Sequence, residues 1–135
     1  MEAEKTVFHN EKLRITFTEK GRYMHQTWWG STTDLEFEVL LDRIVEILTE
    51  NKVNGLILDA REHKGLGPSA QALAARRIGQ YATDSGQPFK QAVIVPKDVF
   101  SKFSVTNYTK KLDEYNPVTN RFFDDVAKAK EWMEE

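Results

Sequence analysis

The fold of this chain is decided by the stretch Val53-Asn54-Gly55-Leu56-Ile57-Leu58-Asp59-Ala60-Arg61, which leads through Gly65-Leu66-Gly67 into Pro68-Ser69. A short unbroken apolar run between turn residues is typical of a strand covered on both faces, as in a parallel sheet. The proline and serine then open a helical pattern. Because open α/β sheets place ligands or partners beyond the carboxyl ends of such strands, this stretch predicts both an architecture and a place to look for function.

The remaining strands are predicted from similar patterns. A second apolar run at residues 92–95, stopped by Pro96, predicts the next covered strand. Upstream, residues 13–18 alternate apolar and polar side chains, which is typical of a strand with one buried face. Residues 23–29 return as its antiparallel partner after a turn at Lys20-Gly21, and residues 6–9 and 121–123 add short strands.

Helices are predicted between and after these strands. Thr33 and Glu36 form a capping-box pattern that opens an amphipathic helix to about residue 51. The second helix runs from residue 68 to about 83, and Asp98 caps a third with Val99, Phe100 and Phe103 on its apolar side. A fourth follows Asp124-Asp125. The order predicts an α/β fold in one domain over residues 1–135: N-terminal antiparallel strands feed a mostly parallel sheet covered by about four helices.

Composition excludes several classes of function. The chain has 135 residues, a net charge of −2 and no cysteine. The charge gives no field that would gather nucleic acid, and thiol catalysis, disulfides and thiolate metal sites are excluded. The histidines His9, His25 and His63 lack metal-ligand spacing, so we expect no metal and no cofactor. No apolar run is long enough for membrane insertion, and we expect a cytoplasmic protein.

Three segments carry a resemblance to a known family: residues 55–59 with the helix near Ser69, residues 92–95, and the closing run from Phe122 to Met133. Together they resemble the STAS fold of anti-anti-sigma factors, and more specifically the small SpoIIAA-like bacterial proteins. That chain path is shared with the CRAL-TRIO lipid-binding fold. The resemblance implies that a serine at the start of the helix is phosphorylated and switches the binding of a kinase or sigma-factor regulator. Ser69 occupies roughly that position, but Pro68 stands where the family has an aspartate.

The segment after the first covered strand holds the candidate binding residues. Asp59, Arg61, His63 and Ser69 are grouped there. Ser69 has an alternative explanation, because Gly67-Pro68-Ser69 is a good helix start on structural grounds alone. Asp59 with His63 could serve as an acid–base pair, but a solvated charged loop is the favoured interpretation, because loops are commonly polar and nothing else completes a site. Arg76-Arg77 on the second helix and Lys110-Lys111 later in the chain could pair with an acidic partner, but with a net charge near zero such basic pairs are more often solvated helix faces.

Four aromatic residues form a second candidate set: Trp28, Trp29, Phe100 and Phe103. Neighbouring strand residues face opposite sides, so one indole is expected to enter the core while the other points outward. An outward tryptophan can rim an apolar pocket or meet a second subunit, and the two phenylalanines can line a ligand cleft. Core packing is the simpler expectation for Phe100, Phe103 and at least one tryptophan. Exposed aromatics on an edge hairpin would also favour a homodimer.

These observations lead to one functional hypothesis and two alternatives. The first is a non-enzymatic binding or regulatory module that acts through the loop of residues 61–69 and the following helix start, with an unidentified protein partner. The second is a carrier of a small apolar or lipid-like ligand held between sheet and helices. The third, an enzyme built on Asp59 and His63, has the least support, because no other residues complete a catalytic site.

Overall fold

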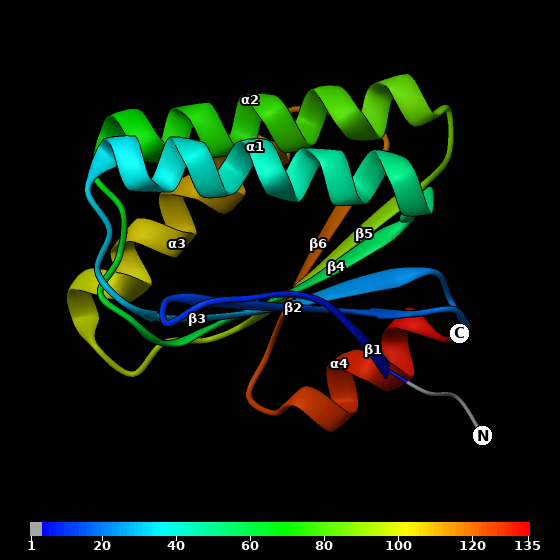
Figure 1. The fold of residues 1–135 in the computed structure, drawn as a ribbon, viewed down its shortest axis with the longest axis horizontal. Coiled ribbons are helices and arrows are strands. Elements are labelled where there is room, and N and C mark those ends of the chain that lie inside the picture. The colour runs from blue at the N-terminus through cyan, green and yellow to red at the C-terminus, as the bar shows by residue number, and fades with distance from the viewer. Residues whose placement is uncertain (1–3) are drawn as a thin grey trace.

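The computed structural model describes residues 4–135 as six strands and four helices (Figure 1). The strands are β1 (Glu4–His9), β2 (Leu13–Thr18), β3 (Tyr23–Gly30), β4 (Gly55–His63), β5 (Phe89–Ile94) and β6 (Val118–Phe123). The helices are α1 (Asp34–Asn51), α2 (Pro68–Ser85), α3 (Val99–Leu112) and α4 (Val126–Met133). The predicted order of elements is confirmed.

All six strands form a single sheet in the order β1-β2-β3-β4-β5-β6. The first three are antiparallel neighbours, and β3 to β6 run parallel to one another. Leu58 lies opposite Val93, so the two apolar runs identified in the sequence are adjacent and parallel, as predicted. Each parallel crossover carries one helix, which is the arrangement expected of βαβ units.

The helices cover the two faces of the sheet unequally. Helices α1, α2 and α3 lie on one face, and α4 lies alone on the other (Figure 1). The larger core lies under the three helices and includes Ile15, Leu41, Ile44 and Leu56. The smaller core lies under α4 and includes Ile57, Ile94 and Trp132. Leu56 and Ile57 are successive residues of β4 that point to opposite faces, so this strand is buried on both sides as its sequence predicts.

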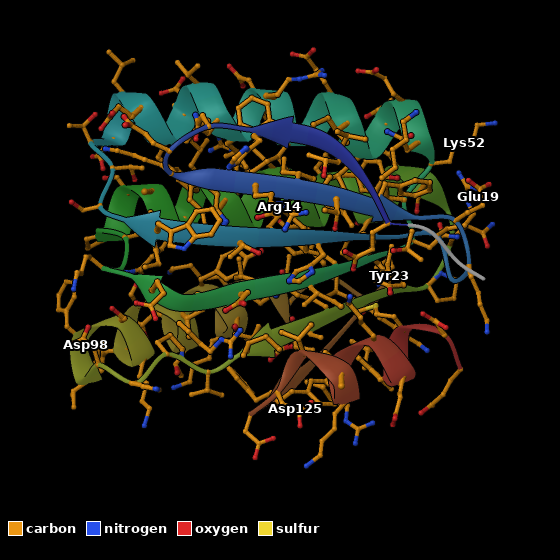
Figure 2. All side chains as sticks on the ribbon, turned by 60° about the horizontal axis from the view of Figure 1, so that its bottom comes forward. Arg14, Glu19, Tyr23, Lys52, Asp98 and Asp125 are labelled. Atoms are coloured by element: carbon orange, nitrogen blue, oxygen red, sulfur yellow. The ribbon has the colours of Figure 1, made fainter. Side chains whose placement is uncertain are left out.

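Side-chain caps fix where three of the helices begin. Thr33 and Glu36 form the predicted capping box at α1, in which the threonine hydroxyl accepts from the Glu36 amide at 3.1 Å. Asp98 caps α3 and Asp125 caps α4 in the same way, and both are labelled in Figure 2. Helix α2 has Gly67 as its N-cap with Pro68 in its first turn. Pro68 stabilises this start because its fixed φ suits the first turn and its missing amide would be unpaired there.

Two features of the structure correct the sequence predictions. Strand β4 continues through His63, so Arg61 and His63 belong to the strand and the connection to α2 consists only of residues 64–67. The expected core packing of Phe100 and Phe103 is wrong, because their side chains are 64% and 69% exposed. Helix α3 instead faces the core with Ser101, Ser104, Val105, Tyr108 and Leu112.

Gly79 marks the closest approach of α2 to the segment that follows α3. A Cβ at this position would lie 2.4 to 2.5 Å from the ring carbons of Tyr115, including the carbon nearest the backbone. Such a contact forces a shift of the ring or of the helix, because tightly packed interiors do not accommodate an added methyl group without strain.

We therefore expect Gly79→Ala to lower the free energy of unfolding by about 1–3 kcal/mol, although alanine favours the helix. In a Tyr115→Ala background the same change should raise it by up to about 1 kcal/mol, the helix propensity difference. Urea denaturation of the wild type, Gly79→Ala, Tyr115→Ala and the double variant measures both effects. A stabilising effect of alanine in both backgrounds would show that the contact with Tyr115 is unimportant.

Candidate functional site

The candidate site lies at the carboxyl edge of the parallel strands, which we define as the connections of residues 31–33, 64–67 and 95–98. These connections follow β3, β4 and β5 and lead into the first turns of α1, α2 and α3. Figure 1 shows the three helix starts gathered at this end of the molecule. The prediction from sequence had placed the working surface here, because the crevice outside the strand ends is the usual binding site of open α/β sheets.

A bulge in β4 separates the predicted site residues. Thr27 pairs with Asp59, but Trp29 pairs with Glu62, so β4 carries one extra residue between these pairs. Bulges redirect the side chains that follow them. His63 consequently faces the helices α1–α3, where its ring centroid lies 5.4 Å from that of Trp28. Asp59 faces the other side of the sheet, so Asp59 and His63 do not form the acid–base pair that the sequence allowed.

Asp59 and Arg61 form a close ion pair on the α4 side of the sheet. The guanidinium donates from Nε to Oδ1 at 3.0 Å and from Nη2 to Oδ2 at 2.8 Å. Burial would raise the pKa of Asp59, but the hydrogen bonds from Arg61 outweigh burial and hold that pKa below its ordinary value. Both groups are therefore charged and paired, and this bidentate geometry fixes Arg61 along the strand.

His63 is the buried ionisable group of the site. Its side chain is only 9% exposed, and within residues 4–135 its Nε2 atom has no hydrogen-bond partner. Burial lowers the pKa of His63 from 6.5 to about 4, because removal from water penalises the charged imidazolium. At neutral pH the imidazole is uncharged, so it can act as one donor and one acceptor.

A small apolar cavity lies beside His63, between the sheet and the three helices. Its volume is about 60 Å³, and His63, Gln26 and Tyr108 bring polar atoms to a wall that is otherwise mainly apolar. Trp28 forms part of the wall and donates from Nε1 to Oε1 of Gln26 at 2.9 Å. The Tyr108 hydroxyl donates away from the cavity to Oε1 of Gln91 at 2.7 Å. The cavity can therefore offer an occupant few polar contacts.

Two serines of α3 attach the 64–67 connection to that helix. The Ser101 hydroxyl donates to the carbonyl of His63 at 2.8 Å, and the Leu66 amide donates to Oγ of Ser104 at 2.8 Å. Gly65 has a φ of +94° and presses against the Phe100 ring, which lies 3.1 Å from where a Cβ would be. A side chain at this position would meet both an unfavourable φ and the aromatic ring, so glycine is required.

Because Ser101 and Ser104 face the core, the phenylalanines of α3 face the solvent. Val99, Phe100 and Phe103 are 80%, 64% and 69% exposed. Phe100 and Phe103 line an open groove between the start of α2 and α3, together with Leu66 and Pro68. Ser69 is exposed in the first turn of α2 and follows Pro68 in the sequence, but it does not itself line the groove. The apolar side chains thus gather near the start of α2, whereas Asp59, Arg61 and His63 lie on β4.

The two tryptophans separate as predicted for neighbouring strand residues. Trp28 is buried beside Phe37 and His63, whereas Trp29 is partly exposed on the other side of the sheet. Helix α4 packs mainly against β4, β5 and β6, and it also shares a core with Tyr23 of β3. Figure 2 shows Arg14 on β2, away from α4. Trp29 therefore does not line the cavity with Trp28.

Sequence reasoning missed several residues that shape the site. Gln26 and the two serines of α3 gave no signal, because polar residues at those positions fit a solvated face equally well. His25 was noted only as an isolated histidine, yet burial lowers its pKa despite the opposing charge of Glu4. Among the described residues no cluster of histidines and carboxylates has the arrangement of a metal site. Over the same range, none of the helices has the length and apolar character required to cross a bilayer.

Comparisons with known proteins identify the fold. No protein-family model and no curated protein matches the sequence. The structure is similar to that of an uncharacterized protein of the DUF3478 family from Shewanella loihica PV-4, which has a SpoIIAA-like fold. The match has a TM-score of 0.54 and 16% sequence identity, and covers 98% of this chain and 97% of that chain. The fold is therefore SpoIIAA-like, as the sequence resemblance implied.

The burial of His63 predicts a pH dependence of stability. Because its folded pKa is depressed from 6.5 to about 4, the stability that the neutral ring contributes is complete above pH 6.5. It is lost as the pH falls toward 4, since only the unfolded chain then binds the proton. Between pH 7 and pH 4 this effect lowers the free energy of unfolding of the wild-type protein by roughly 3 kcal/mol, and we expect the loss to be absent in His63→Phe.

Urea denaturation at pH 7 and at pH 4 measures this change, with His25 left in place in both proteins. The wild-type protein should lose more free energy of unfolding than His63→Phe over this interval. Equal losses in the two proteins would show that His63 is solvated in the folded state.

Proposed function

We propose that the protein is a non-enzymatic binding module that engages a protein partner at the carboxyl edge of its sheet. The surface consists of the 64–67 connection, the first turn of α2 and the exposed side of α3. The observation that carries the proposal is the exposure of Val99, Phe100 and Phe103 on one short helix segment beside Pro68. Clustered large apolar side chains on a surface are typical of a binding site, whereas single ones are ordinary.

The rigidity of this surface supports the proposal. The bonds from Ser101 to the His63 carbonyl and between Ser104 and Leu66 hold the connection against α3. Gln71 of α2 also donates to the Leu66 carbonyl at 2.7 Å. A surface that is already ordered loses less conformational entropy when a partner docks, so more of the contact energy appears as affinity.

Ser69 provides a place at which such binding can be regulated. Its hydroxyl is exposed in the first turn of α2, where an added phosphate would interact favourably with the helix dipole. The same charge would lie beside the apolar groove and oppose the docking of apolar side chains. Phosphorylation at Ser69 would therefore weaken the proposed interaction without unfolding the helix.

The double variant Phe100→Ser/Phe103→Ser tests the proposed surface. We expect it to recover a partner from source-cell extract at least about tenfold less well than the wild-type protein, because it lacks the two aromatic side chains that the partner would cover. The free energy of unfolding should change by less than about 0.5 kcal/mol, since both side chains are exposed. Quantitative pull-down with mass spectrometry measures recovery.

Leu35→Ser/Val39→Ser is the matched control. Leu35 and Val39 are apolar residues of α1 that are 73% and 61% exposed, so this variant removes comparable apolar surface from another helix. It should retain the partner. Equal recovery by all three proteins would refute the proposed surface.

The cavity beside His63 supports a second candidate function, the carriage of a small apolar ligand. Its volume of about 60 Å³ is well below the roughly 150 Å³ of an apolar cavity that binds benzene. A lipid chain does not fit this space as it stands, so a carried molecule would have only a few heavy atoms. The binding-surface proposal is better supported, because it needs no rearrangement of the core.

Ala60→Val separates the two candidate functions. Ala60 is buried and lines the cavity, and an added pair of methyl groups would fill it. We expect the substitution to raise the free energy of unfolding by about 0.5–2 kcal/mol and to leave partner recovery unchanged. Native mass spectrometry tests the carrier directly: a small molecule bound to the wild type and absent from Ala60→Val would support it, and bare wild-type protein would exclude it.

A further inference from the structure

We propose that the groove between α2 and α3 binds an acidic amphipathic segment of a partner protein. This inference rests on the proposed function and adds the chemistry of the partner. The groove is lined at one end by Leu66, Pro68, Phe100 and Phe103, in the middle by Gln71 and Asn107, and at the other end by Lys110, Lys111 and Glu114. It therefore changes from apolar to basic along its length.

The residues that α3 contributes form one stripe of the helix. Phe100, Phe103, Asn107 and Lys110 follow one another at steps of three or four residues, and Lys111 lies four residues after Asn107, so these residues border one face. Phe103 and Lys110 are seven residues apart, which corresponds to about 10 Å along the helix axis. A complementary ligand must present an apolar side chain and a carboxylate at about that separation. An extended segment of polyproline II conformation does so with positions three apart in sequence, since each residue advances about 3.1 Å and every third side chain shares a face. A helical segment does so with positions seven apart.

The basic end of the groove carries two exposed lysines. Arg43 and Arg77, on α1 and α2, are paired with acidic residues. Within residues 4–135, Lys110 and Lys111 have no ion-pair partner, although the chain as a whole has a net charge of −2. Lys110 and Lys111 lie in the last turn of α3, where positive charges interact favourably with the helix dipole. This interaction accounts for their charge but not for their alignment with two exposed phenylalanines.

Of the two acidic residues near this end, Asp113 is bonded elsewhere and Glu114 lines the groove. Asp113 accepts from Nδ2 of Asn120 at 2.6 Å, which directs its carboxylate toward β6. Glu114 borders the groove and confines the basic patch to Lys110 and Lys111. A carboxylate on the ligand would thus meet two ammonium groups, whereas a basic ligand would be repelled by them.

The middle of the groove favours a protein segment over a membrane surface. Asn107 carries an amide that forms no hydrogen bond within the described residues, and the Gln71 amide uses only its nitrogen, toward the Leu66 carbonyl. Lipid chains would bury these polar groups without partners, which is costly. A peptide backbone supplies both donors and acceptors to them. The hollow shape of the surface also suits a segment lying along it.

Selection of peptides from a displayed library of random 12-residue sequences tests the chemistry of the partner. The probe is the selected peptide, resynthesised with a fluorophore, and its affinity is measured by anisotropy with wild-type protein and variants. We expect selected peptides to combine a large apolar residue with Asp or Glu three or seven positions away. Lys110→Glu/Lys111→Glu should weaken binding by about tenfold or more, the loss expected when charge-assisted contacts become repulsive.

Two further variants separate a charge effect from a folding effect. Lys110→Gln/Lys111→Gln removes the charges without reversing them and should give a smaller loss of affinity. Arg76→Glu/Lys102→Glu reverses two exposed charges that do not line the groove. It should leave the affinity within about twofold of the wild-type value, because salt screens solvated charges that do not contact the ligand. Circular dichroism verifies that each variant is folded.

The alternative results overturn the inference in distinguishable ways. Peptides that require Phe100 and Phe103 but have no acidic preference would refute the acidic partner and leave the binding surface intact. Peptides that bind equally well to Phe100→Ser/Phe103→Ser would refute both proposals. Flotation of the wild-type protein with vesicles of phosphatidylglycerol and phosphatidylcholine, abolished by that double variant, would replace the protein segment with a membrane.

Discussion

Burial of β4 on both of its faces is the constraint on which the rest of the structure depends. Leu56 and Ile57 alternate between the two cores, so neither face of the strand can be left to water. The chain meets this requirement with parallel neighbours on both sides, because the crossovers needed to make strands parallel supply covering helices. The carboxyl edge, with three helix starts, is a geometric consequence of that solution.

The same constraint explains why the aromatic residues of α3 are exposed. Helix α3 must pack against both the sheet and the 64–67 connection, whose carbonyl and amide groups require partners. Ser101 and Ser104 supply those partners, and they occupy the helix face that phenylalanines would otherwise fill. Once the serines face inward, helical periodicity places Phe100 and Phe103 outward. The need to hydrogen-bond these backbone groups in the core thus places an apolar patch on the surface.

The sequence was sufficient for the fold because its signals are local and mutually consistent. The capping box at Thr33, the apolar runs in β4 and β5 and the stripe of α4 each predict their own element, and the order of elements determines the sheet topology. The candidate site was harder to predict because it depends on side-chain direction. One additional residue in β4 turns His63 away from Asp59, and no turn residue or proline in the sequence marks that bulge.

Phe100 and Phe103 show a second limit of sequence reasoning. Large apolar residues at helical spacing indicate a buried face. The neighbouring Ser101 and Ser104 do not by themselves indicate that their own side of the helix is buried instead. Only the backbone groups of residues 63–66, brought against α3 by the fold, decide which face is inward. The error is informative, because an apolar face that the core does not use must be explained by something outside the core.

The relation between cavity and surface favours function at the surface. The cavity of about 60 Å³ lies beside an uncharged His63 and is closed in by the same connection that borders the groove. The connection held by the bonds from Ser101 and Ser104 lines the cavity, whereas the proposed docking on Phe100 and Phe103 would leave those bonds intact. Docking on the ordered surface therefore avoids the cost of exposing the His63 and Leu66 backbone groups. Since the proposed docking does not require that cost, the small void is more simply explained by incomplete packing around His63.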